Sequence, residues 1–159
     1  MSSGLVPSRE FTRHVHDNCL CFHLQRAARV VARRFDEAFR PLGLTNGQYT
    51  LLMSLNREQP PTIGQVSSGL AMDRTTLTAN LKPLQRRGLV QVTVDPDDRR
   101  SRRLVLTPAG RQLLVNAIPL WEQTLAEVPR LLAQSGSGSD PGPESLSAAL
   151  RALCAEPPA

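Results

Sequence analysis

Midway along the chain the apolar residues change their spacing twice, and this change limits the possible folds more than any other feature. Up to Gly88 they recur every three or four residues, as they do on one face of a helix. From Val90 to Val94 they alternate with polar residues, which predicts a strand. A turn-forming Asp-Pro-Asp-Asp run separates this strand from a second one at 102–106, and helical spacing returns after Pro108. This order predicts a mainly α-helical fold with a small β-hairpin wing.

Helix start signals surround this segment. Thr45 and Thr62 each have Gln three residues later, the pattern of a capping box, and Asp73 is a good N-cap for a helix that ends at Gly88. Before them, apolar residues at spacings of three and four predict one long amphipathic helix over 15–42. A helix of that length usually packs against a partner, here a second subunit.

The C-terminal third is also expected to be helical. A fifth helix begins at Pro108, and Pro119 and Pro129 inside it should kink or break it. The Gly- and Ser-rich run 135–142 has the composition of a flexible connector. A last helix is predicted from about 144 to 154.

The composition excludes several classes of protein. No apolar run approaches the roughly 20 residues that span a bilayer, and the N-terminus has no apolar segment of signal-peptide length. Three cysteines are too few for a disulfide framework and fit a reducing compartment. With 159 residues the chain has the size of one domain, taken here as 1–159. These features predict a single-domain cytoplasmic protein with no membrane partner.

The positive charge is concentrated in one quarter of the chain. Of 19 basic and 14 acidic residues, nine basic and four acidic lie between Met72 and Arg111, so this segment holds the whole net charge of +5. Nearly all the cations are Arg, which suits bidentate recognition of phosphates and bases. A coding bias towards Arg would explain the scarcity of Lys but not the clustering. The surplus predicts a surface that binds a polyanion.

The helix that begins after Asp73 has the side chains of a recognition helix. Short hydrogen-bonding groups near its N-terminus, with cations behind them, suit base reading in the major groove and contact with phosphates. Cations at the hairpin tip would reach the minor groove. The residues predicted to bind DNA are Arg74, Thr75, Thr76, Thr78, Ala79, Asn80, Lys82, Arg86, Arg99, Arg100 and Arg102. The residues predicted to form a small core behind this face are Ile63, Val66, Leu70, Leu77 and Leu81. Ordinary caps and a solvated turn would explain each feature singly, but their order along the chain favours DNA binding.

The segment 66–88 (VSSGLAMDRTTLTANLKPLQRRG), followed by LVQV, DPDDRRSRR and LTPAG, resembles the MarR family of transcriptional regulators. The resemblance extends from the long first helix to the last one. It implies an obligate homodimer whose interface comes from 15–42 and 108–154, with 45–107 as the winged helix-turn-helix DNA-binding lobe. Each subunit of such a dimer would read half of a pseudo-palindromic site in double-stranded DNA.

The resemblance also implies roles for single residues. Arg100 falls at the wing position that commonly contacts DNA, and Asp98 would hold the wing by pairing with a neighbouring Arg. Pro83 departs from the pattern because it lies inside the recognition helix, where it removes an N–H and should bend the helix.

Two hypotheses describe the signal that such a regulator would sense. Many family members bind small aromatic or phenolic acids between the dimer helices and the DNA-binding lobe, so the first is a repressor released from its operator by such an effector. The second is a thiol switch, because Cys21 lies in a Leu-Cys-Phe sequence that resembles the organic-hydroperoxide-sensing branch of the family. A helix N-terminus favours the oxidisable thiolate. That branch surrounds its cysteine with tyrosines, where this chain has Gln25, Phe35 and Asn46.

The candidate redox or effector residues are Cys19, Cys21, His23, Arg26, Asn46 and Tyr49. Cys19, Cys21 and the three histidines near them match no standard zinc spacing, so neither a metal nor a cofactor is expected. Packed cysteines and solvated histidines near a frayed terminus are an equally good interpretation of this cluster, and Cys154 fits helix packing.

Two other functional classes fit less well. A peroxidase acting through Cys21 would need chemistry for which the sequence has no motif, because it lacks a Cys-x-x-Cys pair, a nucleophile elbow and a phosphate loop. The chain is therefore not expected to be an enzyme. A sequence-neutral architectural protein would not need a Thr- and Asn-rich reading face. The sequence leaves open the operator, the effector, and repression as opposed to activation.

Overall fold

The structure, a computed structural model, describes residues 6–133 and 143–154. In that part of the chain it has one two-stranded antiparallel sheet among helices, which confirms the expected mainly helical fold with a hairpin wing. The elements are α1 (Arg9–Asn18), α2 (Leu20–Phe39), the 3-10 helix η1 (Arg40–Leu42), α3 (Asn46–Ser54), α4 (Ile63–Gly69), α5 (Arg74–Arg86), β1 (Val90–Val94), β2 (Arg102–Leu106), α6 (Pro108–Ala133) and α7 (Pro143–Cys154).

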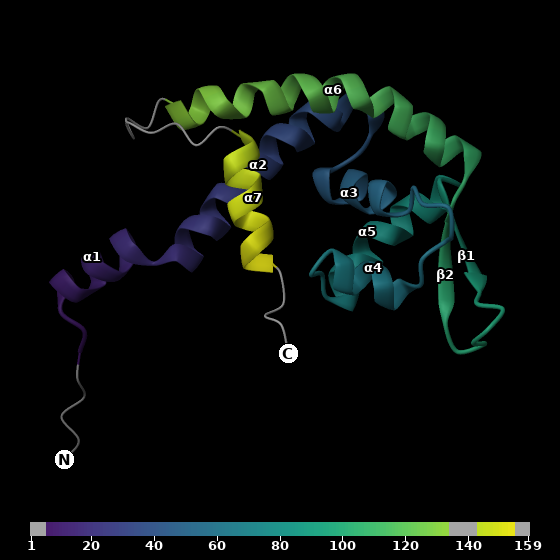
Figure 1. Ribbon diagram of the computed structural model, residues 1–159, viewed down its shortest axis with the longest axis horizontal. Helices are drawn as coiled ribbons and strands as arrows, with labels where there is room; N and C mark the ends of the chain where they lie inside the picture. The colour runs from purple at the N-terminus through teal and green to yellow at the C-terminus, as the bar shows by residue number, and fades with distance from the viewer. Residues whose placement is uncertain (1–5, 134–142, 155–159) are drawn as a thin grey trace, which may run out of the picture.

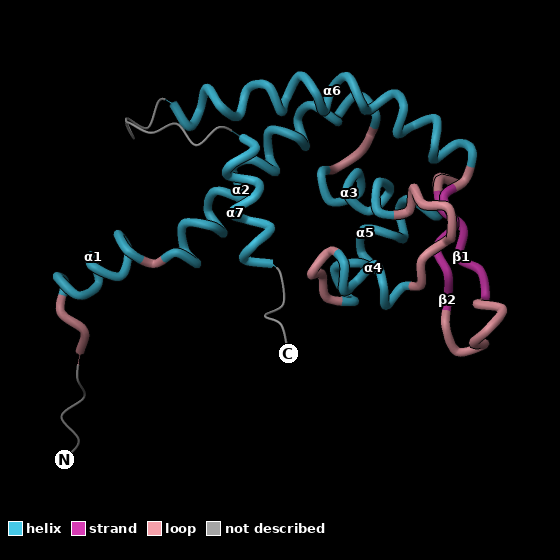
Figure 2. Tube along the Cα trace, in the orientation of Figure 1, coloured by secondary structure: helices cyan, strands magenta, loops and turns pink. Residues whose placement is uncertain are grey.

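The helices form a long arch with a lobe beneath one end of it. Figure 1 shows α6 bowed over the molecule, with α3, α4, α5 and the hairpin gathered under its N-terminal half. Figure 2 shows the hairpin as the extended arm of that lobe. α6 packs on α2, and α3 packs on both α2 and α5. α1 and the first turns of α2 extend away from the lobe, so the arch and the lobe meet at the C-terminal end of α2.

The core lies where α2, α3, α5, the hairpin and α6 meet. Its largest fully buried side chains are Phe39, Leu51, Leu52, Leu77, Leu84 and Leu104. The small core predicted behind the recognition helix is confirmed, because Val66, Leu77 and Leu81 are buried while Ile63 and Leu70 are partly buried against them. Burying such apolar surface, at about 25 cal/mol per Å², is what holds helices this short in place.

The helix caps agree with the sequence signals. Thr45 and Thr62 each form a capping box in which the hydroxyl accepts the N–H of a Gln three residues later and the Gln side chain accepts the N–H of the Thr. Asp73 caps α5. Gly88 follows that helix with φ 68°, a conformation that costs Gly little.

The first long helix was predicted incorrectly. The expected single helix over 15–42 is divided at Cys19, whose backbone is extended at φ −75° and ψ 100°, and its last residues form η1. Just before the break the Asn18 side chain donates a hydrogen bond to the His14 carbonyl at 2.8 Å, a local bond that competes with helical pairing. The helix α1 also begins earlier than expected, because Ser8 accepts the N–H of Phe11 and caps it.

The prolines disturb the helices less than the sequence suggested. α6 continues through Pro119 and Pro129 without ending, and it bows in Figure 1. α5 likewise continues through Pro83 to Arg86. The connector predicted at 135–142 lies outside the described residues. Among the described residues, no helix is both long enough and apolar enough to cross a membrane.

Candidate nucleic-acid interface

One exposed face of α5 gathers five of the predicted DNA-binding residues. Arg74, Thr75, Thr78, Ala79 and Lys82 line a shallow hollow of about 390 Å³. Their spacing puts them on one side of the helix, while Leu77, Leu81 and Leu84 on the other side are buried in the core. The result is a short polar surface with a cation at each end.

Two threonine hydroxyls on α5 already donate their hydrogen. Thr76 donates to Asp73 Oδ2 at 2.7 Å, and Thr78 donates to the Arg74 carbonyl at 2.7 Å. A hydroxyl has one hydrogen and two acceptor positions, so both oxygens remain free to accept. The hydroxyl and the backbone N–H of Thr76 also hold the pKa of the Asp73 carboxyl below its usual 3.8, so this helix cap is ionised at neutral pH.

Asn80 and Arg86 lie apart from the hollow. Asn80 is half-buried, its side chain donates to the Thr76 carbonyl at 3.0 Å, and its amide oxygen lies close to Gly47 of α3. Arg86 is exposed in the last turn of α5. The structure therefore divides the predicted base-reading and phosphate-binding residues of α5 between its N-terminal face, the contact with α3, and its C-terminal end.

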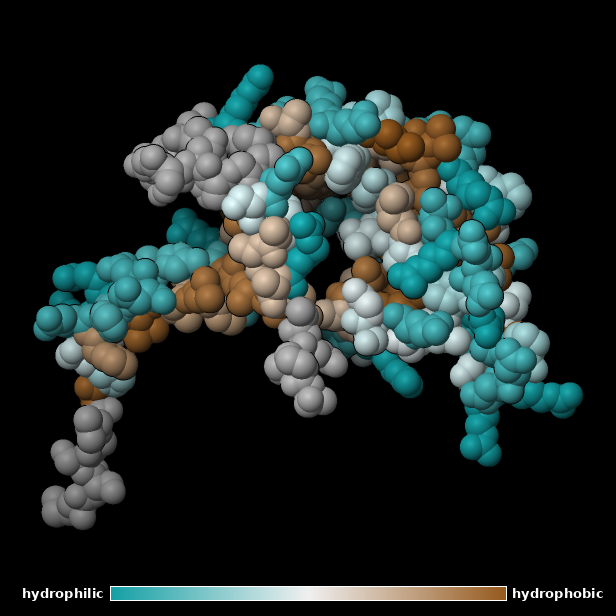
Figure 3. Space-filling view, in the orientation of Figure 1, coloured by the Kyte–Doolittle hydropathy of each residue, from teal (hydrophilic) through white to brown (hydrophobic). Residues whose placement is uncertain are grey.

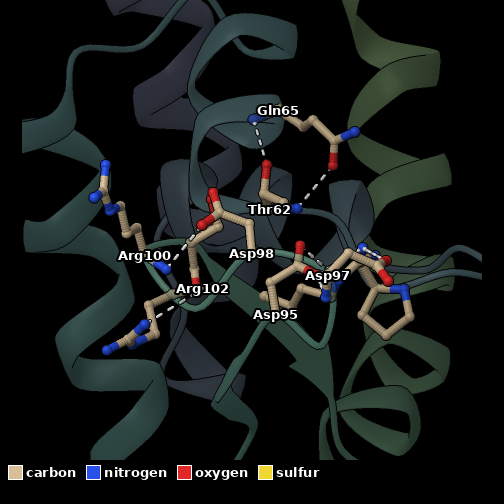
Figure 4. A network of polar contacts seen from close by, with 10 residues as sticks. Thr62, Gln65, Asp95, Asp97, Asp98, Arg100 and Arg102 are labelled. Carbon is tan, nitrogen blue, oxygen red and sulfur yellow. Dashed lines mark hydrogen bonds and ion pairs between the residues drawn. The ribbon is translucent and has the colours of Figure 1, made fainter.

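The arginines at the wing tip differ in whether their guanidinium groups are hydrogen-bonded to the protein. Arg99 and Arg100 are exposed, and no hydrogen bond or ion pair engages the Arg100 guanidinium among residues 6–133 and 143–154. Figure 4 shows the Arg100 side chain pointing out of the turn. Arg102 folds back, because its Nη1 donates to the carbonyls of Arg99 at 2.9 Å and Ser101 at 3.0 Å. Figure 3 shows hydrophilic side chains projecting from this tip.

The expectation that Asp98 pairs with an arginine is wrong. Its carboxylate accepts the backbone N–H of Arg100 at 2.9 Å and the hydroxyl of Ser101 at 2.9 Å, which closes the turn locally (Figure 4). Short Asp side chains commonly make such bonds to the backbone of residues just ahead of them. Asp98 therefore shapes the turn without neutralising any guanidinium.

A different pair holds the base of the wing. Asp95 is buried, and its two carboxylate oxygens lie 2.9 and 3.1 Å from Nε and Nη2 of Arg103. The N–H of Asp97, and then Arg103, hold the pKa of Asp95 below its usual 3.8. Arg103 Nη1 also donates to the Pro60 carbonyl at 3.0 Å, so one guanidinium ties the hairpin to the loop before α4. Arg103 is one of the nine basic residues between Met72 and Arg111, but its guanidinium binds groups of the protein itself.

The candidate effector residues do not form one site within the chain. Cys21, His23 and Arg26 are exposed near the start of α2, whereas Tyr49 is buried in the core, stacked on Phe39 with ring centroids 4.5 Å apart. Burial raises the pKa of Tyr49. Asn46 lies near the other end of α2, where its backbone N–H donates to Asp36. At 1.5 Å per residue, Cys21 and Asp36 are roughly 22 Å apart along the helix.

The surroundings of the cysteines are polar. Gln25 Nε2 lies 3.3 Å from the Cys21 sulfur, and the side-chain oxygen Oε1 of Gln25 accepts a hydrogen bond from Arg29 Nη2 at 3.2 Å. Cys19 is half-buried at the break between α1 and α2, and Cys154 is exposed on α7. In the part of the chain that the structure describes, no group of three or more His, Cys, Asp or Glu side chains could hold a metal ion.

The family model described as the MarR family matches residues 42–101, the segment from η1 to the wing turn. The crystal structure of the M. tuberculosis transcriptional regulator MosR in complex with DNA superposes with a TM-score of 0.70 and 34% identity, covering 86% of this chain and 94% of that one. The chain belongs to the MarR family. It is a DNA-binding transcriptional regulator of the MarR type and not an enzyme.

Two further MarR-type relatives bear on the signal. The organic hydroperoxide resistance transcriptional regulator of Bacillus subtilis (strain 168) is 29% identical over 104 residues, which cover 65% of this chain and 71% of that protein. The structure of Bordetella bronchiseptica BpsR, described in terms of the regulation of its DNA binding by 6-hydroxynicotinic acid, gives a TM-score of 0.67 at 26% identity and covers 84% of this chain and 89% of that one. Similar proteins thus include one named for resistance to organic hydroperoxides and one whose DNA binding is regulated by an aromatic acid.

Proposed function

We propose that this MarR-type chain acts as a homodimeric repressor that binds a pseudo-palindromic operator and is released from it by a small aromatic acid. The observation that carries the DNA-binding part is the pairing of two exposed surfaces on one lobe. One is the polar hollow on α5, and the other is the wing tip with its outward Arg100. A helix for the major groove and a basic hairpin for the minor groove are the two parts that a winged helix needs.

The exposed face of α5, made of the hollow and the neighbouring Thr76, is proposed to read bases. The hydroxyl hydrogens of Thr76 and Thr78 are already used in hydrogen bonds within the protein, so the two oxygens are left to accept. Hydrogen-bond donors on the DNA, such as the amino groups of cytosine and adenine that face the major groove, would suit them. Arg74 and Lys82 at the ends of the hollow would contact phosphates. Thr75, Ala79, Asn80 and Arg86 complete the proposed set on α5, with Asn80 limited by its contact with α3.

The wing is proposed to bind the minor groove through Arg99 and Arg100, with Arg102 beside them. The narrow minor groove has a strongly negative potential, which favours an inserted guanidinium. The Asp95–Arg103 pair stiffens the base of the hairpin, so Arg100 loses less conformational entropy when it binds.

The dimer is proposed to form through 15–42 and 108–154, leaving 45–107 as the DNA-binding lobe. Both helical parts leave large apolar side chains exposed in the single chain, which for a monomer would be costly. Figure 3 shows a hydrophobic stretch along α1 and the start of α2. The exposed apolar residues on these parts are Val15, Leu20, Phe22, Val30, Val115, Ile118, Leu125, Leu150 and Leu153.

The wing contact is tested by the salt dependence of binding. A duplex selected from a random library by the purified protein serves as the probe, in fluorescence anisotropy. Arg100→Ala should lower the slope of log affinity against log salt by about 1, because each phosphate contact contributes about 0.9. Arg130→Ala removes the same charge from the exposed end of α6, far from the hairpin in Figure 1, and should leave the slope unchanged. Equal slopes for the wild type and Arg100→Ala would contradict the wing contact.

The effector class is supported by BpsR, whose DNA binding is regulated by 6-hydroxynicotinic acid. The exposed His23 and Arg26 on α2 supply positive groups for a carboxylate, and a second subunit would have to complete the site. Titrating the protein–DNA complex with 6-hydroxynicotinic acid and with salicylate tests the proposal. Release of the duplex by either acid supports it, whereas affinity unchanged by both speaks for another signal.

A thiol switch at Cys21 is the second candidate, favoured by one observation. The Gln25 amide points at the exposed sulfur and is itself held by Arg29, so a hydrogen-bond donor is fixed where it would stabilise a charged sulfur. In the proposed step the thiolate attacks the terminal oxygen of an organic hydroperoxide. The S–O bond forms and the O–O bond breaks, sulfur is oxidised to sulfenic acid, and the alkoxide leaves and takes a proton from water.

Oxidation of the DNA complex tests this second candidate. Cumene hydroperoxide should release the duplex from the wild type and not from Cys21→Ser. Cys154→Ser is the matched control, because Cys154 is also exposed but lies on α7, and it should respond like the wild type. Release that persists in Cys21→Ser would remove Cys21 from the mechanism.

A further inference from the structure

Arg87 is a basic residue of the DNA-binding lobe whose guanidinium faces the protein. It is the C-cap residue of α5, with Nη1 2.6 Å from the Gly43 carbonyl and Nη2 3.0 Å from the Leu42 carbonyl. These carbonyls belong to the end of η1, the continuation of α2, and they are 44 and 45 residues away in the sequence. One side chain therefore joins the recognition helix to the long helix of the arch.

The electrostatics of this junction favour a cation. The C-terminal ends of η1 and α5 lie together, and each carries the partial negative charge of a helix C-terminus. A guanidinium between them satisfies two carbonyls and offsets the repulsion of the two ends. Gly43 has φ 62°, and a Cβ added there would lie 3.6 Å from Arg87 Nη1, so the turn fits closely around the guanidinium.

A second connection between α2 and α5 is indirect and runs through α3. Asp36 of α2 accepts the N–H of Asn46, the first residue of α3, at 2.6 Å. The next residue, Gly47, leaves room for the Asn80 amide of α5, whose oxygen would lie 3.0 Å from an added Cβ. α5 is thus connected to the arch through Arg87 at its C-terminal end and through α3 nearer its middle, and two separated points fix its direction as well as its position.

We propose that Arg87 is a positioning residue that sets the orientation of the recognition helix relative to α2, and thereby the half-site spacing that the dimer accepts. The inference rests on the proposed function, a homodimer that reads two half-sites. In such a dimer α2 belongs to the dimer part, so the Arg87 clamp sets the distance between the two α5 helices. Arg87 acts without contacting DNA, although it is basic and lies in the DNA-binding lobe.

The experiment, in the full-length protein, compares Arg87→Gln with Arg57→Gln, which removes the same charge from an exposed position between α3 and α4 in the same lobe. The probes are the duplex selected by the wild-type protein, the same duplex with one base pair inserted at its centre, and a scrambled duplex of equal length. One inserted pair moves a half-site by about 3.4 Å and rotates it by roughly a tenth of a turn. Affinity on the first two probes gives the spacing preference, and the salt slope on the scrambled duplex counts phosphate contacts.

Arg87→Gln should reduce the spacing preference about fivefold, the factor that corresponds to loss of hydrogen bonds from one exposed charged group. It should leave the salt slope unchanged. Arg57→Gln should keep the spacing preference of the wild type. Circular dichroism establishes that each variant is folded, and if Arg87→Gln is not, Arg87→Lys replaces it, since Lys lacks the two-pronged fork and should change the spacing preference in the same direction.

Three results would overturn the inference. A salt slope lowered by about 1 in Arg87→Gln would make Arg87 a phosphate contact. A folded Arg87→Gln with the wild-type spacing preference would show that the clamp does not set the spacing. If the wild-type protein enriches no sequence with two half-sites, the proposed function itself is wrong and the inference falls with it.

Discussion

Gly110→Ala should destabilise the protein although it adds one methyl group to a helix. Gly110 is buried in the first turn of α6. A Cβ at this position would overlap the carbonyl oxygen of Leu89 and lie 2.7 Å from Cδ1 of Leu106. The Leu106 side chain could shift, but the Leu89 oxygen belongs to the backbone that enters β1 and accepts the Thr107 N–H at 3.1 Å. The helix would have to move away from the hairpin.

The size of the effect follows from two opposing contributions. Overpacking against a fixed atom costs about 3 kcal/mol, the upper part of the usual range. Replacing Gly by Ala inside a helix stabilises the helix by up to about 1 kcal/mol, because Ala has the higher helix propensity. We therefore expect a loss of about 2 kcal/mol in the free energy of unfolding, which for a chain of this length lowers Tm by roughly 4–8 °C.

Urea unfolding followed by far-UV circular dichroism measures this loss. The midpoint should fall while the m-value stays constant, at equal protein concentrations because a dimer's stability depends on concentration. Gly69→Ala is the matched control, since Gly69 is also helical but has no heavy atom within 4 Å of its added Cβ. It should be neutral or slightly stabilising. A Gly110→Ala protein as stable as Gly69→Ala would refute the close approach of α6 to the hairpin.

Two further predictions concern polar groups of the lobe. Because the pKa of Asp95 is held below 3.8, its charged form stabilises the fold above that pH, and this contribution is lost as the pH falls through the lower folded-state pKa. Asp95→Asn should therefore flatten the decline of the unfolding free energy below about pH 4, and an unchanged decline in urea titrations at several pH values would count against the Asp95–Arg103 pair. Thr62→Ala should cost about 1 kcal/mol by removing the cap of α4, whereas Thr62→Ser should keep it, as thermal unfolding would show.

The parts of the fold that the sequence predicted are those fixed by neighbours in the chain. A capping box needs only a Thr and the Gln three residues later, and both boxes form as expected. The hairpin follows from alternation and a turn within the same 17 residues, 90–106. The break at Cys19 was missed because helical apolar spacing continues across it, while the competing bond of Asn18 leaves no mark on that spacing.

The parts of the candidate site that were missed depend on partners distant in the sequence. Arg87 bonds to carbonyls 44 and 45 residues away, and Arg103 bonds to Pro60, 43 residues away. From the composition, both residues are simply cations of a DNA-binding segment. The spacing of residues in the sequence cannot show which distant carbonyls a guanidinium will bind. For Arg87 a weak signal existed, because a basic residue just before a C-terminal Gly often binds the last carbonyls of a helix.

Some cations of this segment add to its positive charge without being free to contact phosphates, and this has a measurable consequence for DNA binding. Of the nine cations between Met72 and Arg111, Arg87 and Arg103 bind carbonyl or carboxylate groups of the protein itself, which leaves at most seven for phosphates. The salt slope per subunit therefore has an upper limit of about 6, since each contact contributes about 0.9. Arg87 still adds to the long-range attraction because carbonyls do not cancel its charge, whereas Arg103 is neutralised by Asp95. More cations thus contribute to the long-range attraction to DNA than can contact its phosphates. This arrangement is expected if some residues speed association and others orient the recognition helix.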